Sequence, residues 1–135
     1  MRSYDLEMLT YLKLADLSRR KRQTLGSDKL LVLAGVAACR AGCLNVAERC
    51  REIIVRHHPR HLLARFASFS DALRAEDFAP LLKRLKKLCP FEQAEFLARQ
   101  WNLTEESLAD RSAAEVETAA LAILADADWQ DSLSM

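Results

Sequence analysis

Residues 30–59 carry the pattern that decides the fold, and they read LLVLAGVAACRAGCLNVAERCREIIVRHHP. Leucine, valine and alanine dominate the first part, which ends at Gly42, and glycine commonly ends helices. A second stretch with helical spacing of apolar residues follows and stops before Pro59, which cannot continue a helix. The stretch therefore predicts two antiparallel helices joined by a short turn.

The composition of the chain extends this prediction to all 135 residues. There are 23 leucines and 21 alanines against five valines and three isoleucines, so strong helix formers far outnumber β-branched residues. Half of the residues are hydrophobic, and the length suits one domain. We expect a single all-α domain over residues 1–135, which excludes a Rossmann domain, a P-loop enzyme and a β-sandwich.

Caps and spacing divide the chain into seven or eight short antiparallel helices, arranged as repeat-like helical hairpins or as a compact bundle. Four segments follow one another: an N-terminal helix with a basic end (1–25), the repeat-like hairpin (27–59), further helices (60–101) and an acidic C-terminal segment (102–135). The helices are expected at residues 4–22, 27–42, 45–58, 60–74, 77–88 and 90–101, from residue 104, and at residues 112–128.

Polar residues mark several helix starts. Ser27 is expected to cap the second helix with Asp28 beside it, and residues 45–48 (NVAE) and 112–115 (SAAE) are typical of capping boxes. The tail, residues 126–135, is polar and expected to be frayed. The sixth helix is expected to bury Phe91, Phe96, Leu97 and Trp101.

The hairpin resembles a tetratricopeptide repeat, a pair of antiparallel helices that approach closely through small residues. The resemblance rests on Leu31, Ala34, Gly35, Ala38, Gly42, Ala47 and Pro59, with residues 45–48 at the turn and residues 58–60 at the exit. A second, weaker repeat follows about 34 residues later. It comprises Phe69, Ala72, Glu76, Leu81 and Leu85.

In that family the inner face of each first helix forms a peptide-binding groove, so the resemblance implies a protein partner. The corresponding residues here are Lys29, Val32, Val36, Cys39 and Arg40. The two cations suit acidic groups, and the two valines favour an apolar helix or peptide over a terminal carboxylate. We therefore expect a non-catalytic adaptor that binds a peptide or helix between helical hairpins, or that pairs with a second copy.

Two basic clusters support an alternative, a nucleic-acid-associated protein. The candidate phosphate-binding residues end the first helix, where cations also suit the helix dipole: Arg19, Arg20, Lys21 and Arg22. A second basic face comprises Lys83, Arg84, Lys86 and Lys87. Residues 97–109 resemble a helix-turn-helix, but its second helix carries Glu105 and Glu106, which would repel phosphates.

A further alternative is a Cys/His metalloprotein. The residues that suggest it lie about one or two helical turns apart: Cys39, Cys43, Cys50 and His57. Their spacing matches no CxxC knuckle, and free cysteines pack as small apolar groups, so we expect core packing, no metal and no cofactor. No motif assembles a nucleophile, a base and an oxyanion site, so no catalytic residue is predicted.

The formal net charge of +1 conceals a split along the chain. Residues 1–99 carry 19 basic and 11 acidic residues, and residues 100–135 carry one basic and eight acidic residues. We expect the acidic segment to fold against the basic body or to attract a second copy. The longest apolar run, residues 30–39, is too short to cross a membrane, and acidic residues near Met1 argue against a signal peptide, so a cytoplasmic protein with four free thiols is expected.

Overall fold

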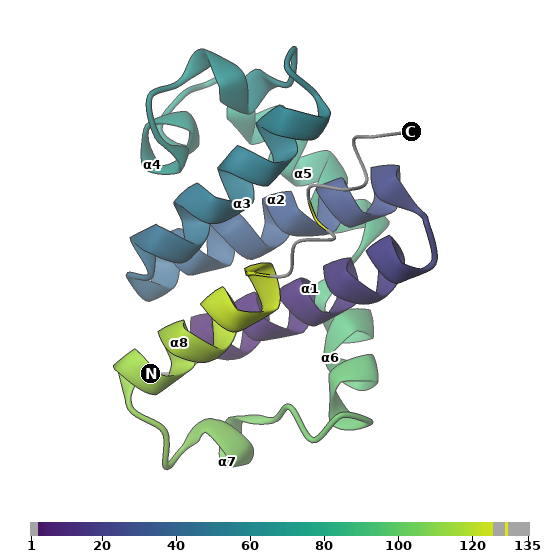
Figure 1. The fold of residues 1–135 in the computed structure, drawn as a ribbon, viewed down its shortest axis with the longest axis vertical. Coiled ribbons are helices and arrows are strands. Elements are labelled where there is room, and N and C mark those ends of the chain that lie inside the picture. Colours follow the sequence, from purple (N-terminus) through teal and green to yellow (C-terminus); the bar gives the residue numbers. More distant parts are fainter. Residues whose placement is uncertain (1–2, 126–128, 130–135) are drawn as a thin grey trace.

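The computed structural model describes residues 3–125 and residue 129, and this part of the chain forms eight α-helices and no strand. The prediction of an all-α fold is therefore confirmed. Helix α1 (Ser3–Arg20) packs against α2 (Thr24–Ala41), and α3 (Leu44–His57) packs against α2 in turn. Figure 1 shows these three helices as the frame of the molecule.

Helix α2 lies at the centre of this frame. Every residue from 30 to 38 is buried, because α1 and α3 cover α2 together with two later helices, α4 (Phe69–Leu73) and α5 (Phe78–Leu88). The helix ends as predicted at Gly42, whose φ of 81° lies in the left-handed region that glycine adopts without strain. A helix that is apolar all round is a core element.

Helix α2 begins earlier than the sequence predicts, so the prediction that Ser27 caps it is wrong. The turn after α1 closes early because Arg22 adopts a positive φ of 62° and the Gln23 N–H bonds the Ser18 carbonyl at 2.9 Å. Ser27 then lies inside the helix, where its buried hydroxyl donates to the Ala15 carbonyl at 2.9 Å. The hydroxyl ties α2 to α1 instead of ending a helix.

The predicted capping box at residues 45–48 is also wrong. Helix α3 starts at Leu44 without a side-chain cap, because both polar residues have partners elsewhere in the fold. The Asn45 amide donates to Glu117 on α8 (Ala113–Leu124) at 3.4 Å, and the Glu48 carboxylate accepts the Phe69 N–H at 2.6 Å. The other predicted capping box, at residues 112–115, is confirmed in its first half, since the Ser112 hydroxyl accepts the Glu115 N–H at the start of α8.

The single helix predicted over residues 60–74 is absent. The segment forms a 3-10 turn η1 (Leu62–Arg65), an extended link and the short helix α4. Helix α3 supplies the cause, because the Arg51 guanidinium donates to the Leu63 carbonyl at 3.3 Å and to the Phe66 carbonyl. These backbone groups are satisfied by side chains of α3, so the segment does not need helical hydrogen bonds.

The later helices follow their predicted starts. Asp77 precedes α5, Pro90 precedes α6 (Phe91–Arg99) and Thr104 caps α7 (Glu105–Leu108). The predicted buried face of α6 is wrong at two positions, because Phe96 is 65% exposed and Leu97 is exposed as well, whereas Phe91 packs on the core and Trp101 is half-buried. The fully buried positions of α6 are Ala94 and Ala98, and the Phe91 ring centre lies 5.9 Å from that of Tyr11 on α1.

Helix α8 packs on α1 and α3, so the acidic part of the chain lies on the basic body (Figure 1). Trp129 beyond it is only 1% exposed, which contradicts the expectation of a frayed tail at this position. Its indole N–H donates to the Ile123 carbonyl at 2.9 Å, and the Arg19 guanidinium lies 4.6 Å from its ring centre. Residues 126–128 and 130–135 of the predicted tail lie outside the described part of the chain.

Candidate functional site

The candidate site begins with Asp28, which the early start of α2 places inside that helix. Its side chain is buried and faces the end of α3. Burial raises the pKa of Asp28, and the hydrogen bond and charge of the neighbouring His57 oppose this shift. A buried carboxylate needs such partners. Without them, its desolvation costs several kcal/mol, which is a large part of the free energy of unfolding of an ordinary domain.

Two consecutive histidines supply these partners. His57 Nδ1 lies 2.9 Å from Asp28 Oδ1, and His58 Nε2 lies 2.8 Å from Asp28 Oδ2. The second contact is close, but its geometry falls short of an aligned hydrogen bond. The side chain of His57 is only 4% exposed and its Nε2 lies 2.9 Å from the Trp129 carbonyl, whereas the side chain of His58 is 38% exposed. One histidine therefore belongs to the core and the other faces outward.

A third histidine follows in the turn after Pro59. The Leu63 N–H donates to His61 Nδ1 at 3.1 Å, which caps the 3-10 turn η1. Since Nδ1 accepts this bond, the neutral ring carries its proton on Nε2. Burial lowers the pKa of His61, and the nearby charge of His58 lowers it further. His61 is thus held as a neutral ring with a free donor.

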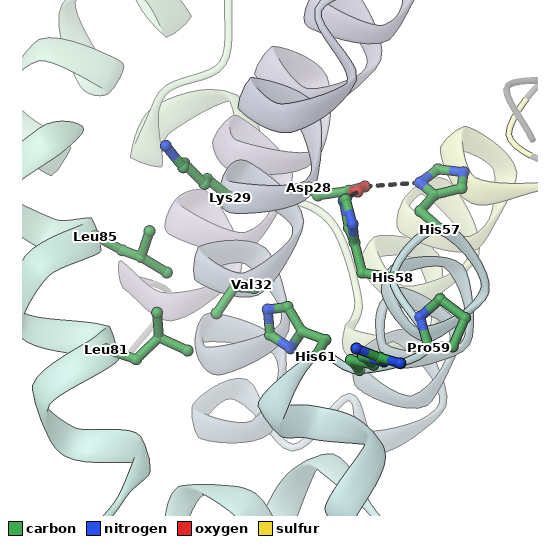
Figure 2. A pocket seen from close by; sticks show the side chains of 10 residues that line it. Asp28, Lys29, Val32, His57, His58, Pro59, His61, Leu81 and Leu85 are labelled. Carbon is green, nitrogen blue, oxygen red and sulfur yellow. Dashed lines mark hydrogen bonds and ion pairs between the residues drawn. The ribbon is translucent and has the colours of Figure 1, made fainter.

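These residues line a cavity of about 570 Å³ between α2, the turn after α3, and α5. Figure 2 shows Leu81 and Leu85 on one side, Val32 at the centre, and the histidines on the other side. Pro59 completes the apolar lining, and Lys29 and Arg60 lie at the exposed rim. Within the described part of the chain, neither of these two cations forms an ion pair.

The electrostatics of this pocket favour an anionic group. Asp28 is the one carboxylate among the described residues that line it, and both of its oxygens face histidines. Lys29, Arg60 and the Nε2–H of His61 are therefore donors without a competing acid at the rim. An apolar floor with a few polar groups is the usual construction of a binding pocket.

The five groove residues implied by the tetratricopeptide resemblance do not lie together. Lys29 and Val32 line the pocket, whereas Val36, which is as buried as Val32, does not line it. Cys39 lies near the other end of α2 with its sulfur 3.8 Å from the Ser70 hydroxyl, and the Arg40 guanidinium lies 5.9 Å from the Tyr4 ring centre. The structure therefore keeps the first part of the predicted face as a site and covers the middle of it.

The candidate phosphate-binding run at the end of α1 is partly used inside the molecule. Arg19 and Arg20 both pair with Asp16, Arg20 at 3.1 Å, and Arg19 also stacks on Trp129. Lys21 and Arg22 are exposed. The second basic cluster keeps all four side chains exposed along α5: Lys83, Arg84, Lys86 and Lys87.

The helix-turn-helix and metal alternatives gain no support from the geometry. Asn102 does adopt the left-handed conformation, with φ of 59°, but the following helix α7 has only four residues, which is too short to read a groove. The four cysteines are free thiols. Across residues 3–125 and 129, no three acidic, histidine or cysteine side chains are grouped so that they could hold a metal ion.

Sequence reasoning missed most of this site. It placed Asp28 at a helix start, weighed His57 only as a zinc ligand, and assigned Leu81 and Leu85 to the weak second repeat. The available clue was the run His57–His58–Pro59–Arg60–His61, in which three imidazoles and a cation follow the last turn of a helix. Their meeting with Asp28 and α5 depends on contacts between distant segments.

Comparisons with protein-family models, with curated proteins and with solved structures found no match to this chain. Within the described part of the chain, every helix is too short or too polar to span a membrane.

Proposed function

We propose that this protein is a non-catalytic interaction module that binds a segment of a protein partner in the pocket between α2, the turn after α3, and α5. The observation that carries the proposal is the pairing of an apolar floor with two exposed cations, Lys29 and Arg60, that have no described ion-pair partner. The site differs from the groove implied by the repeat resemblance, but it keeps Lys29 and Val32.

The chemistry of the pocket defines the partner. A cavity of about 570 Å³ lined by Val32, Leu81 and Leu85 accommodates one or two large apolar side chains. The cations at its rim favour aspartate or glutamate beside those side chains, because charge-assisted hydrogen bonds to carboxylates are stronger than neutral ones. The expected partner is therefore an extended or helical segment in which leucine-like and acidic residues alternate, in a cytoplasmic setting that keeps the thiols reduced.

Isothermal titration calorimetry with a defined probe tests the proposal. The probe is an amidated peptide of alternating leucine and glutamate, and the matched peptide carries lysine in place of glutamate. We expect only the acidic peptide to bind, and the double variant Lys29→Glu, Arg60→Glu to weaken binding about 10-fold or more. Arg111→Glu changes an exposed cation in the connection before α8 and should leave binding unchanged. Equal binding of both peptides would count against the proposal.

A nucleic-acid role remains the second candidate, because α5 exposes four cations on one helix. It predicts binding to a short DNA or RNA duplex that weakens steeply with salt. A gel shift at ~50 mM salt tests it, with Lys83→Glu, Lys87→Glu as the variant and Lys29→Glu, Arg60→Glu as the control. If the α5 variant binds duplex as well as the native protein does, this candidate is dropped.

A further inference from the structure

The pocket contains a buried pair whose net charge is fixed. The Trp129 carbonyl can only accept a hydrogen bond, so His57 Nε2 carries a proton. The 2.9 Å contact between His57 Nδ1 and Asp28 Oδ1 then contains one further proton, which lies either on the imidazole or on the carboxyl group. In both arrangements, Asp28 and His57 together are neutral. They orient the site without adding charge to it.

His61 is also fixed, for a different reason. Its Nδ1 accepts the Leu63 N–H, so a second proton could be added only by breaking that bond. Burial and the charge of His58 both lower the pKa of His61. His61 therefore remains neutral near pH 7 and serves as a hydrogen-bond donor through Nε2.

His58 differs from both, because its Nε2 faces Asp28 Oδ2 at 2.8 Å while neither constraint applies to its Nδ1. Its side chain is 38% exposed and lines the pocket, and a second proton on it would add one positive charge there. The other charged and titratable groups that line the pocket come from the helices and the turn around it. Helix α2 contributes Asp28 and Lys29, and α3 contributes His57. The turn after α3 contributes His61 and Arg60, and α5 contributes only Leu81 and Leu85.

We propose that binding of an acidic partner in this pocket is coupled to the uptake of one proton by His58, so that the partner is held more tightly as the pH falls. The proposal rests on the proposed function of the pocket. A partner carboxylate beside Lys29 and Arg60 adds negative charge next to His58, and negative charge favours the protonated imidazole. By linkage, a partner that raises the affinity of His58 for a proton is itself bound more tightly when His58 is protonated.

Linkage also sets the size of the effect. Uptake of one proton gives a limiting slope of one in log Kd against pH, which is about 10-fold per pH unit. The effect is measured between about pH 8 and about pH 5.5. Glutamate side chains of a peptide probe stay ionised there, because their ordinary pKa is about 4.3. We expect the Kd to fall as the pH is lowered through this range, by at most about 10-fold per pH unit.

Isothermal titration calorimetry of the full chain with the leucine–glutamate peptide measures both the dependence of the Kd on pH and the number of protons taken up on binding. The Kd is recorded from about pH 8 to about pH 5.5, and proton uptake is read from the heats in two buffers of different ionisation enthalpy. His58→Gln keeps an amide nitrogen that can reach Asp28 but cannot take up a proton. It should bind without proton uptake, and its Kd should no longer fall as the pH is lowered.

His61→Asn is the matched control. Its amide oxygen can accept the Leu63 N–H, so the turn is kept while one pocket donor changes. We expect weaker binding but an unchanged dependence of log Kd on pH. Binding without proton uptake, or an unchanged slope in His58→Gln, would overturn this inference and leave the proposed function standing. A peptide that fails to bind at any pH would overturn both.

Discussion

Two neighbouring regions with similar apolar spacing fold differently, namely the hairpin of α2 and α3 and the segment of residues 60–74. In the hairpin, the backbone groups are satisfied within each helix, and small residues allow close packing. In the segment, Arg51 and Glu48 of α3 bond backbone groups at Leu63, Phe66 and Phe69. The difference shows that apolar spacing predicts which residues are buried, but not which partners the backbone finds.

Gly35 joins the two regions, and its substitution should have the largest effect. A Cβ atom at this position would lie 2.2 Å from a ring carbon of Phe69, which is buried at the start of α4. Gly35→Ala should therefore lower the free energy of unfolding by about 3 kcal/mol, because overpacking outweighs the gain in helix propensity. Urea denaturation measures this change, and an unaltered midpoint would show that α4 does not pack on α2 as described.

Arg51→Met should have the next largest effect on stability, because it removes hydrogen bonds between the hairpin and the segment of residues 60–74. The substitution keeps the aliphatic stem but removes the donors to the Leu63 and Phe66 carbonyls, at a cost of about 2 kcal/mol. Arg49→Met is the control, because its 3.1 Å pair with Glu52 lies at the surface, and such pairs contribute at most about 1 kcal/mol. Hydrogen exchange should quicken first at residues 62–73 in the Arg51 variant.

Alkaline pH should test the hairpin core through Cys50, which is completely buried between α2 and α3. Burial raises the pKa of the Cys50 thiol in the folded chain, whereas the unfolded thiol ionises near pH 8.5. Stability is therefore full below about pH 8.5 and declines above it, by about 1 kcal/mol for this thiol at about pH 9.5. Urea denaturation at both pH values should show a smaller decline in Cys50→Ala, and an equal decline would contradict the assignment.

Gly26→Ala should give the smallest effect, and one of opposite sign. Gly26 lies in the first turns of α2, and a Cβ atom there would meet no atom within 4 Å apart from its chain neighbours and the local backbone of its own helix. The substitution should raise the free energy of unfolding by about 0.5 kcal/mol, because alanine favours the helix. Paired with Gly35→Ala, it distinguishes the open start of α2 from its packed centre. Thermal unfolding of both variants tests this, and a loss of stability in Gly26→Ala would contradict it.

The difference between contacts with neighbouring residues and contacts with distant residues explains which features could be predicted from the sequence. The end of α2 at Gly42, the end of α3 before Pro59 and the caps at Thr104 and Ser112 depend on neighbouring residues, and they were found. Ser27 and Asn45 were misassigned because each bonds a residue far along the chain. Local polar residues predict a cap only when no tertiary partner competes for them.

The pocket was harder to predict for the same reason. Its histidines are adjacent in sequence, but their role depends on Asp28, almost 30 residues earlier, and on Leu81 and Leu85 of α5. Lys29 and Val32 were named as partner-binding residues, but together with Val36, which the core covers. A single sequence does not reveal which face of an apolar helix remains open.

The position of Trp129 late in the sequence affects how the chain folds during its synthesis. Its indole and carbonyl contact α1, the end of α8 and His57 of α3, so early and late parts of the chain meet at this one residue. A ribosome releases the first three helices long before residue 129, and until then His57 and Arg19 lack a partner that they have in the finished fold. The nascent hairpin should therefore remain open to proteases, and complete protection should arrive only when residue 129 emerges.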